Sequence, residues 1–407
     1  NAERILGELT GRFPRSYAGH FLLGRLHLAR KELPAAETAF RRCAEIDPEH
    51  LDPLFELLKI YREQGRKKEI AAVIQEILQL DPENSRASLE LALYHRHSGA
   101  KAEADAILLQ LGERSRKEFE VLLNLIQGYV EPKRSDEALF LIRGMLKADP
   151  ESPDLNHLKG FTLFGLKQYA PALDAFRKVT PASRFYQDAV VHTAFILQEQ
   201  GKTEEALQQV ESAIQKNPAN PELHYYLGTI YEEAGRYEEA LDALTQATQK
   251  APDNANFLFR LGIVYDKQKN KEASIETMRR VIALDPTNAN ALNYLGYTYA
   301  EMGQNLDEAE QLILEALRHK PDDGYITDSL GWVYYQKGDY PRALQHLKRA
   351  HEIVPDDPTI MEHIGDAYLK LNDRASALKF YQRALSKKEK DKEELQRKIK
   401  QLKGGGS

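Results

Sequence analysis

The sequence has almost no cysteine, the residue on which redox chemistry and many zinc sites depend. Its 407 residues include one cysteine, Cys43, and no paired-cysteine or HExxH spacing that would predict a zinc site. A single cysteine does not indicate whether the protein lies in an oxidising or a reducing compartment. We expect Cys43 to be a buried core residue. No set of side chains with catalytic spacing is found. The sequence therefore predicts a non-enzymatic protein with no catalytic residue, no metal site and no cofactor.

Long hydrophobic runs and an excess of positive charge are also lacking. No apolar run approaches the roughly 18 residues that a membrane-spanning helix needs, so no span is predicted. The net charge is −6 with both signs interspersed, which argues against a nucleic-acid-binding protein. Gly201-Lys202-Thr203 resembles the end of a phosphate-binding loop, but Ile196 stands where that loop requires glycine.

Proline is scarce, but about half of the prolines recur at a fixed interval. They lie at positions 14, 48, 82, 150, 218, 252, 286, 321 and 355. The successive gaps are 34, 34, 68, 68, 34, 34, 35 and 34 residues, and the two gaps of 68 are doubled periods. A domain with a single core has no reason to keep this interval. The period therefore predicts a solenoid of repeated units.

Residues 221–254 show what one unit is. Apolar residues around Gly228 follow the spacing of one helix face, Gly235 breaks the helix, and Ala240 begins the stripe of a second helix. Pro252 then ends that second helix. Each unit is therefore predicted to be a helical hairpin.

Small residues recur at two positions of the unit and allow its two helices to approach closely. Glycine occupies the eighth position at 24, 160, 228, 262, 296, 331 and 365, and alanine the twentieth at 36, 104, 138, 172, 206, 240, 309, 343 and 377. One hairpin cannot bury its apolar face alone, so neighbouring hairpins must stack. This pattern of Leu, Gly, Tyr, Ala, Phe, Ala and Pro at 34-residue spacing resembles the tetratricopeptide repeat (TPR) family.

The resemblance implies an all-α, right-handed superhelical solenoid of about eleven repeats. We expect a partial repeat at 1–16, three repeats at 17–118, a middle segment at 119–186, six regular repeats at 187–389 and a capping helix at 390–403. The chain begins with Asn1 and ends in GGGS, which is typical of a trimmed fragment, so 404–407 is expected to be an added linker.

Two joints depart from the pattern. Arg116 stands in one proline slot; at the next irregular joint Pro181 comes early and Arg184 fills the slot. Beside the second joint, Lys159 occupies a position usually held by leucine, where burial would be costly unless its ammonium reaches solvent. Each joint is interpreted either as a tolerated irregularity or as a bend between superhelical segments.

In the TPR family, positions 2, 5, 6, 9, 12 and 13 of each repeat face a concave groove. Carried over to this chain, they give a predicted peptide-binding set: Phe195, Tyr225, Tyr226, Phe259, Arg260, Asn293, Tyr294, Tyr297, Asp328, Trp332 and Tyr335. We expect Tyr294, Tyr297, Trp332 and Tyr335 to form one cluster. The corresponding N-terminal positions, such as Lys59 and Arg62, are more charged. Either the aromatics form an exposed interaction site, or neighbouring repeats bury several of them.

The preferred interpretation is a non-catalytic scaffold that holds a partner peptide with apolar, proline or cationic side chains in this groove. The sequence style is similar to bacterial TPR proteins of envelope, secretion, pilus or exopolysaccharide assembly, which would place the protein in the cytoplasm or periplasm. Two alternatives remain open: the recognition arm of a larger enzyme such as a glycosyltransferase, or a weakly self-associating structural scaffold.

Overall fold

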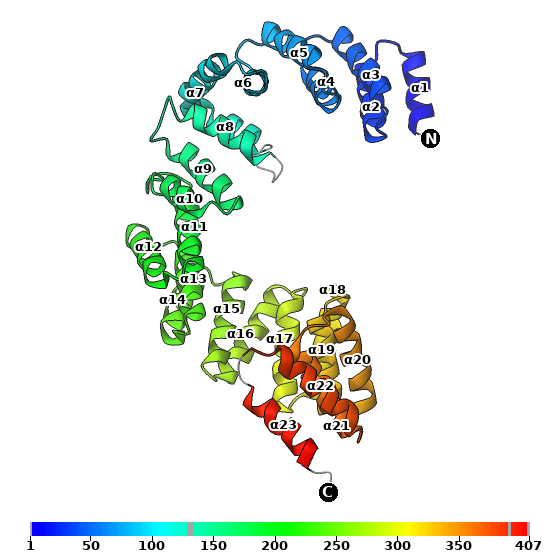
Figure 1. The fold of residues 1–407 in the computed structure, drawn as a ribbon, viewed down its shortest axis with the longest axis vertical. Coiled ribbons are helices and arrows are strands. Elements are labelled where there is room, and N and C mark those ends of the chain that lie inside the picture. Colours follow the sequence, from blue (N-terminus) through cyan, green and yellow to red (C-terminus); the bar gives the residue numbers. More distant parts are fainter. Residues whose placement is uncertain (1, 128–133, 390–391, 405–407) are drawn as a thin grey trace. The chain divides into compact units, whose positions relative to one another are not determined.

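A computed structural model describes residues 2–127, 134–389 and 392–404, and all secondary structure within these ranges is α-helical (Figure 1). The chain divides into two compact units, Asn1–Gln200 and Gly201–Ser407. Each unit is described by itself. None of the described helices is both long and apolar enough to cross a bilayer.

Contacts within unit 1 define four hairpins, and two of these include an irregular helix. The helices of this unit are α1 Ala2–Arg12, α2 Tyr17–Ala29, α3 Leu33–Ile46, α4 Asp52–Glu63, α5 Lys67–Leu80, α6 Ser85–Ser98, α7 Lys101–Gln127, α8 Ser135–Met145, α9 Pro153–Gly165, α10 Tyr169–Phe176 and α11 Tyr186–Glu199. Contacts pair α2 with α3, α4 with α5, α6 with α7 and α9 with α10, and the irregular helices are α7 and α10. Cys43 is fully buried, as predicted, and burial raises the pKa of its thiol to about 11.

Unit 2 is a regular series of hairpins. Its helices are α12 Thr203–Lys216, α13 Pro221–Glu233, α14 Tyr237–Lys250, α15 Ala255–Lys267, α16 Lys271–Leu284, α17 Ala289–Met302, α18 Leu306–His319, α19 Gly324–Gln336, α20 Tyr340–Ile353, α21 Pro358–Lys370, α22 Arg374–Lys387 and α23 Glu393–Gly404. Contacts join the two helices of each hairpin from α13/α14 to α21/α22, and each hairpin to the next. Its largest core cluster extends over several hairpins, with buried residues from Leu258 to Ala343.

The hairpins of unit 2 begin in the same way. Two residues after each closing proline, an Asn or Asp accepts hydrogen bonds from the first backbone N–H groups of the next helix. These caps are Asn220, Asn254, Asn288, Asp323 and Asp357. Because such caps satisfy donors that a helix start leaves unpaired, each new helix begins at a defined residue.

The small residues act as predicted. A Cβ on Gly228 would lie 2.5 Å from Cγ of Leu244, and one on Gly331 would lie 2.7 Å from Cγ of Leu347. Real Cβ atoms do not approach so closely, so larger residues would push the two helices apart. The alanines at the twentieth position are buried throughout. The all-α solenoid of helical hairpins predicted from the period is therefore confirmed.

The first irregular joint is a kinked continuous helix. Without a proline at position 116, α7 runs through the expected break and shows one non-helical residue, Glu118, with φ −118° and ψ 24°. Because proline both removes an N–H donor and clashes with the preceding turn, its absence lets the backbone continue. The kink at Glu118 coincides with the predicted repeat boundary after residue 118.

The second irregular joint is a shortened helix. α10 has 8 residues, whereas α12 and α14 have 14. The early Pro181 disfavours a helical conformation at Thr180, but α10 already ends at Phe176, so the proline alone does not explain its length. Lys159 is half-buried, and burial, together with the nearby Arg143 and Lys178, lowers its pKa. The predicted segment boundaries at 118 and 186, and any bend there, remain predictions.

The C-terminal helix α23 covers the end of the last hairpin. Leu395 is fully buried and Ile399 nearly so, and both belong to a cluster with Tyr381 of α22. Lys398 pairs with Glu362 at 3.0 Å and with Asp366 at 2.8 Å, both on α21. This confirms the predicted capping helix, although residues 390–391 of its predicted span lie outside the described residues.

Candidate binding surface

The first helices of successive hairpins in unit 2 contact one another and form a shared inner layer. Contacts join α13 to α15, α17 to α19 and α19 to α21. Ten of the predicted site residues lie on these helices: Tyr225 and Tyr226 on α13, Phe259 and Arg260 on α15, Asn293, Tyr294 and Tyr297 on α17, and Asp328, Trp332 and Tyr335 on α19. We call this surface the inner face of unit 2.

Trp332 is the centre of one aromatic group on the inner face. Its ring stacks on Tyr335 at a centroid distance of 4.6 Å and on His363 of α21 at 4.2 Å. Trp332 and Tyr335 are half-buried and pack against the core cluster of the unit. Burial, with the nearby Asp366 carboxylate, raises the pKa of Tyr335 to about 12, so its hydroxyl stays protonated at neutral pH.

Asp328 is part of a buried ion pair. Its Oδ2 lies 2.9 Å from Nδ1 of His363, and the two residues are only 6% and 7% exposed. Burial disfavours the charged imidazole, but the Asp328 carboxylate outweighs that penalty and the pKa of His363 is raised. Asp328 is therefore engaged within unit 2 and does not present a free carboxylate to a partner. The sequence did not single out His363, because its pairing with Asp328 depends on how two hairpins stack.

Tyr294 belongs to a second group. Its hydroxyl donates a 2.6 Å hydrogen bond to Oδ2 of Asp266, whose Oδ1 lies 2.7 Å from Nζ of Lys271. Its ring meets Phe259 edge-on at 6.2 Å. No ring contact joins this pair to Trp332 and Tyr335 among the described residues. The one expected cluster is instead two aromatic groups packed against the same core.

The remaining residues of the inner face also pack between hairpins. Tyr225 stacks on Phe257 at 4.8 Å and meets Tyr226 edge-on at 5.5 Å. Nε of Arg260 lies 2.8 Å from Oε2 of Glu232 on α13. Tyr297 is half-buried, and burial raises the pKa of its hydroxyl. These aromatics therefore help to stack the hairpins, a role that the sequence interpretation did not assign to the preferred site.

Three of the predicted residues on the inner face have a buried polar atom without a hydrogen-bond partner among the described residues, and one of these atoms, Nε of Arg260, lies in the ion pair with Glu232. The other two have no ion pair either. One is the acceptor Oδ1 of Asn293 on α17, and the other is the donor Nε1 of Trp332 on α19. Buried polar atoms in folded proteins usually have partners, so each exception needs an explanation. A donor and an acceptor on adjacent helices are what a peptide backbone could satisfy.

Phe195 lies apart from the other predicted site residues, on α11 of unit 1. It is 44% exposed and meets Phe164 edge-on at 5.5 Å, while the neighbouring Phe161 is 42% exposed. These two phenylalanines are more exposed than the aromatics of unit 2, apart from Tyr325. Phe195 and Phe161 therefore form an exposed aromatic patch of unit 1.

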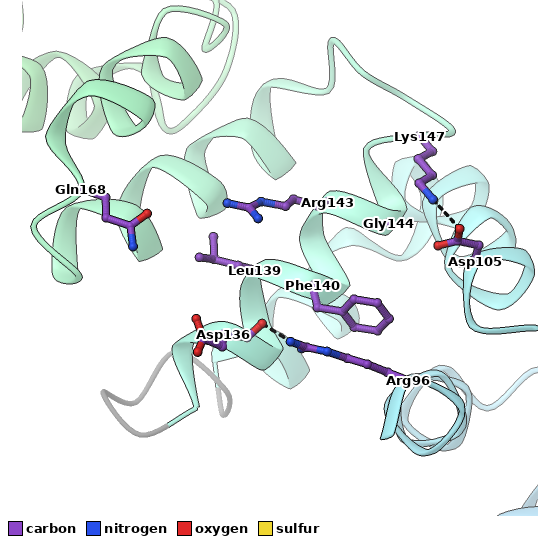
Figure 2. Close-up of a pocket in the computed structure, with 9 residues that line it drawn as sticks. All are labelled: Arg96, Asp105, Asp136, Leu139, Phe140, Arg143, Gly144, Lys147 and Gln168. Atoms are coloured by element: carbon purple, nitrogen blue, oxygen red, sulfur yellow. Dashed lines mark hydrogen bonds and ion pairs between the residues drawn. The ribbon is translucent and has the colours of Figure 1, made fainter. Parts of the chain in front are cut away.

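A 480 Å³ cavity in unit 1 lies outside the predicted site. Figure 2 shows it between α8 and the turn before α10, with Arg96 and Asp105 at its edge. Nζ of Lys147 pairs with Asp105 at 2.7 Å, and a nitrogen of Arg96 donates a 3.0 Å hydrogen bond to the carbonyl of Asp136. Most of its charged groups are thus already paired. No cluster of potential metal ligands occurs in the described part of the chain.

Stacked helical hairpins with a shared inner face define the class of α-solenoid interaction scaffolds. The family to which the chain belongs is the tetratricopeptide repeat family. Sequence profiles described as tetratricopeptide repeat or TPR repeat match residues 1–50, 55–113, 197–257, 231–289, 277–311, 331–372 and 359–395. No curated protein sequence matches the chain significantly.

Solved structures with a similar fold are TPR proteins and related solenoids. A tetratricopeptide repeat protein from Parabacteroides merdae is 18% identical, with a TM-score of 0.51, and the match covers 62% of this chain and 99% of that one. Yeast Tom70 is 12% identical with a TM-score of 0.45 and 95% coverage of both chains. PilF of Pseudomonas aeruginosa is 20% identical with a TM-score of 0.39, covering 45% of this chain and 88% of that one. Likeness at this level of identity concerns the fold alone.

Proposed function

We propose that this TPR scaffold holds a segment of a partner protein against the inner face of unit 2. The observation that carries the proposal is the unpartnered pair of polar atoms, Asn293 Oδ1 and Trp332 Nε1, on adjacent helices beside half-buried aromatic rings. A peptide backbone offers both the N–H and the C=O that these atoms lack. Trp and Tyr side chains are the residues most often found at binding hot spots.

The chemistry of the partner follows from the side chains of the inner face. Glu362 and Asp366 on α21 are already paired with the ammonium groups of Lys388 and Lys398, so they offer no free negative charge to a partner. The flat faces of Trp332 and Tyr335 suit apolar or proline residues. The preferred segment therefore carries apolar or proline residues, and a cationic side chain in it remains a prediction. A role in bacterial envelope, secretion, pilus or exopolysaccharide assembly remains a prediction.

The proposal is tested by selecting a ligand and then removing the two orphaned atoms. An array of synthetic peptides that varies cationic, proline and aliphatic positions would be probed with the full chain, and the best peptide measured by calorimetry. Trp332→Ala should weaken binding by about 2 kcal/mol or more, the usual loss at a hot spot. Asn293→Ala should weaken binding by less, about 1 kcal/mol, because one hydrogen bond to the peptide is lost.

Tyr237→Ala is the matched control, since Tyr237 is an aromatic residue on α14, a second helix of its hairpin. The control variant should bind like the parent chain. Unchanged affinity of Trp332→Ala, with intact helicity by circular dichroism, would remove the inner face of unit 2 from the proposal. A mass that rises with protein concentration would instead favour self-association.

A further inference from the structure

A second candidate site lies in unit 1, on helices α4, α6 and α7, and nothing proposed above uses it. A cavity of 390 Å³ is bounded there by apolar and cationic side chains. Its apolar wall is formed by Phe55, Leu58, Leu89 and Leu125, and its cationic wall by Lys59, Arg62, Arg86 and Arg134. We call it the cationic pocket. Glu90, which is buried, is the one carboxylate among the described residues that line it.

Three of the four cations already have acidic neighbours. Arg62 pairs with Glu90, Lys59 lies 2.7 Å from Glu56, and Arg134 lies 2.7 Å from Glu137. These pairs hold the side chains in place around the cavity. They leave the pocket and its acidic neighbours with an excess of one positive charge.

That excess charge belongs to Arg86. Its guanidinium lies over the Phe55 ring, 3.8 Å from the centroid, and it makes no ion pair or hydrogen bond with any described residue. Stacking on an aromatic face fixes the plane of the guanidinium while its N–H groups stay available. Such a preorganised fork matches the two oxygens of a carboxylate.

A neighbouring cavity extends the same chemistry. It has a volume of 280 Å³, shares Arg62, Glu90 and Arg134 with the cationic pocket, and adds Lys67 and His97. An extended segment could therefore place a second acidic side chain one cavity further along. Glu137, which pairs with Arg134, also lines this second cavity. The two cavities adjoin at the residues that they share.

We propose that the cationic pocket binds an acidic peptide segment, with one carboxylate on Arg86 and an adjacent aliphatic side chain against Leu58 and Leu89. The apolar wall favours such a segment over nucleic acid, because Glu90 and the leucines offer nothing to a densely charged phosphate backbone. This site differs in chemistry from the aromatic inner face of unit 2, and each site can be tested without the other.

The test uses fluorescence anisotropy with defined probes and the full chain. The first probe is a labelled peptide of alternating Glu and Leu with both termini blocked, so that a terminal carboxylate cannot contribute. The second replaces Glu by Lys, and the third is labelled single-stranded DNA. We expect the Glu-Leu peptide to bind most tightly and to weaken as salt is raised, because its main contacts are ionic.

Arg86→Gln should weaken the affinity for the Glu-Leu peptide by about tenfold or more, as expected for loss of a charge-assisted contact. Arg280→Gln is the matched control on α16 of unit 2, and Trp332→Ala should also leave this binding unchanged. Circular dichroism checks that each variant is folded. Equal binding of the Lys-Leu peptide, tighter binding of DNA, no binding of the Glu-Leu peptide, or an Arg86→Gln variant that binds like the parent would each overturn the proposal.

Discussion

The two units of this chain are built from one repeat pattern, yet they differ in regularity. In unit 2 the second helices α14, α16, α18 and α20 all have 14 residues. In unit 1 the corresponding lengths include the 8 residues of α10 and a 27-residue α7 that continues through a hairpin boundary. The difference follows the prolines, since unit 2 keeps one at each closing position and unit 1 loses or shifts two. The closing proline is not the only determinant, because α8 keeps Pro150 and still has 11 residues.

Chemistry distinguishes the units as well. The inner face of unit 2 is aromatic, whereas the cationic pocket of unit 1 combines an apolar wall with Arg86, which makes no ion pair with any described residue. Repeats that share a fold can therefore present different chemistry to their partners. The glycine and alanine positions are common to both units, and the side chains that distinguish the units lie at other positions of the repeat.

The largest expected effect tests whether the two units unfold separately. Leu347 is fully buried in α20, so Leu347→Ala should destabilise unit 2 by about 2–5 kcal/mol through lost burial and a cavity. Hydrogen exchange read by mass spectrometry in urea should show earlier opening of 324–370 with unit 1 unchanged. Leu314→Ala, at an exposed position of α18, is the control and should change stability by less than about 0.5 kcal/mol. Equal loss of protection in both units would mean that they unfold as one.

A second variant restores the missing proline. Arg116→Pro should break the continuous α7 near its kink and cost about 3 kcal/mol where the present helix relies on that backbone donor. Hydrogen exchange should then rise in residues 112–120 and remain unchanged in α14. Undiminished protection there would show that unit 1 accepts the regular repeat without cost, and that its irregularity has another cause.

Two buried histidines give the units opposite responses to pH. The pKa of His363 in unit 2 is raised above 6.5, so its stabilising effect is present below pH 6.5 and lost as pH rises through the raised value. Burial lowers the pKa of His157 in unit 1 to about 4, so unit 1 loses stability as pH falls from 6.5 toward 4.

Urea unfolding monitored by hydrogen exchange at several pH values would compare the units. His363→Gln should make the stability of unit 2 less dependent on pH above pH 6.5. His157→Phe should make the stability of unit 1 less dependent on pH below pH 6.5. A response of the same sign in both units would contradict the assigned surroundings of the two rings.

The smallest effect concerns an exposed ion pair. Arg177 and Asp174 pair at 2.8 Å, with both side chains more than two-thirds exposed. Arg177→Ala should therefore change the stability of unit 1 by no more than about 0.5 kcal/mol in urea denaturation. A loss above about 1 kcal/mol would show that the short α10 depends on this pair.

The sequence predicted the hairpins well because their determinants are local. Glycine and alanine at fixed positions and a proline at the end of each repeat are visible without knowing any neighbour. The two irregular helices also lie at the positions where the sequence lacks its regular proline, 116 and 184. The structure at these two positions differs, since α7 is long and kinked whereas α10 is short.

Contacts between hairpins were not predictable in the same way. Asp328 was assigned to the binding surface from its position in the repeat, but its partner His363 lies 35 residues further along the chain. Tyr294 likewise finds Asp266 at a separation of 28 residues. Which side chains meet across a stacking interface depends on packing distances that periodicity does not specify. For the same reason, the expected aromatic cluster proved to be two groups.

The most direct test of the proposed inner face is photocrosslinking from Tyr325. This residue begins α19 and is 58% exposed, so p-benzoylphenylalanine in its place should be tolerated. The peptide selected for unit 2 should crosslink at this position and not from the same probe at Leu314 on α18. Crosslinking of equal strength from Leu314, or from neither position while the peptide is bound, would contradict binding at the inner face.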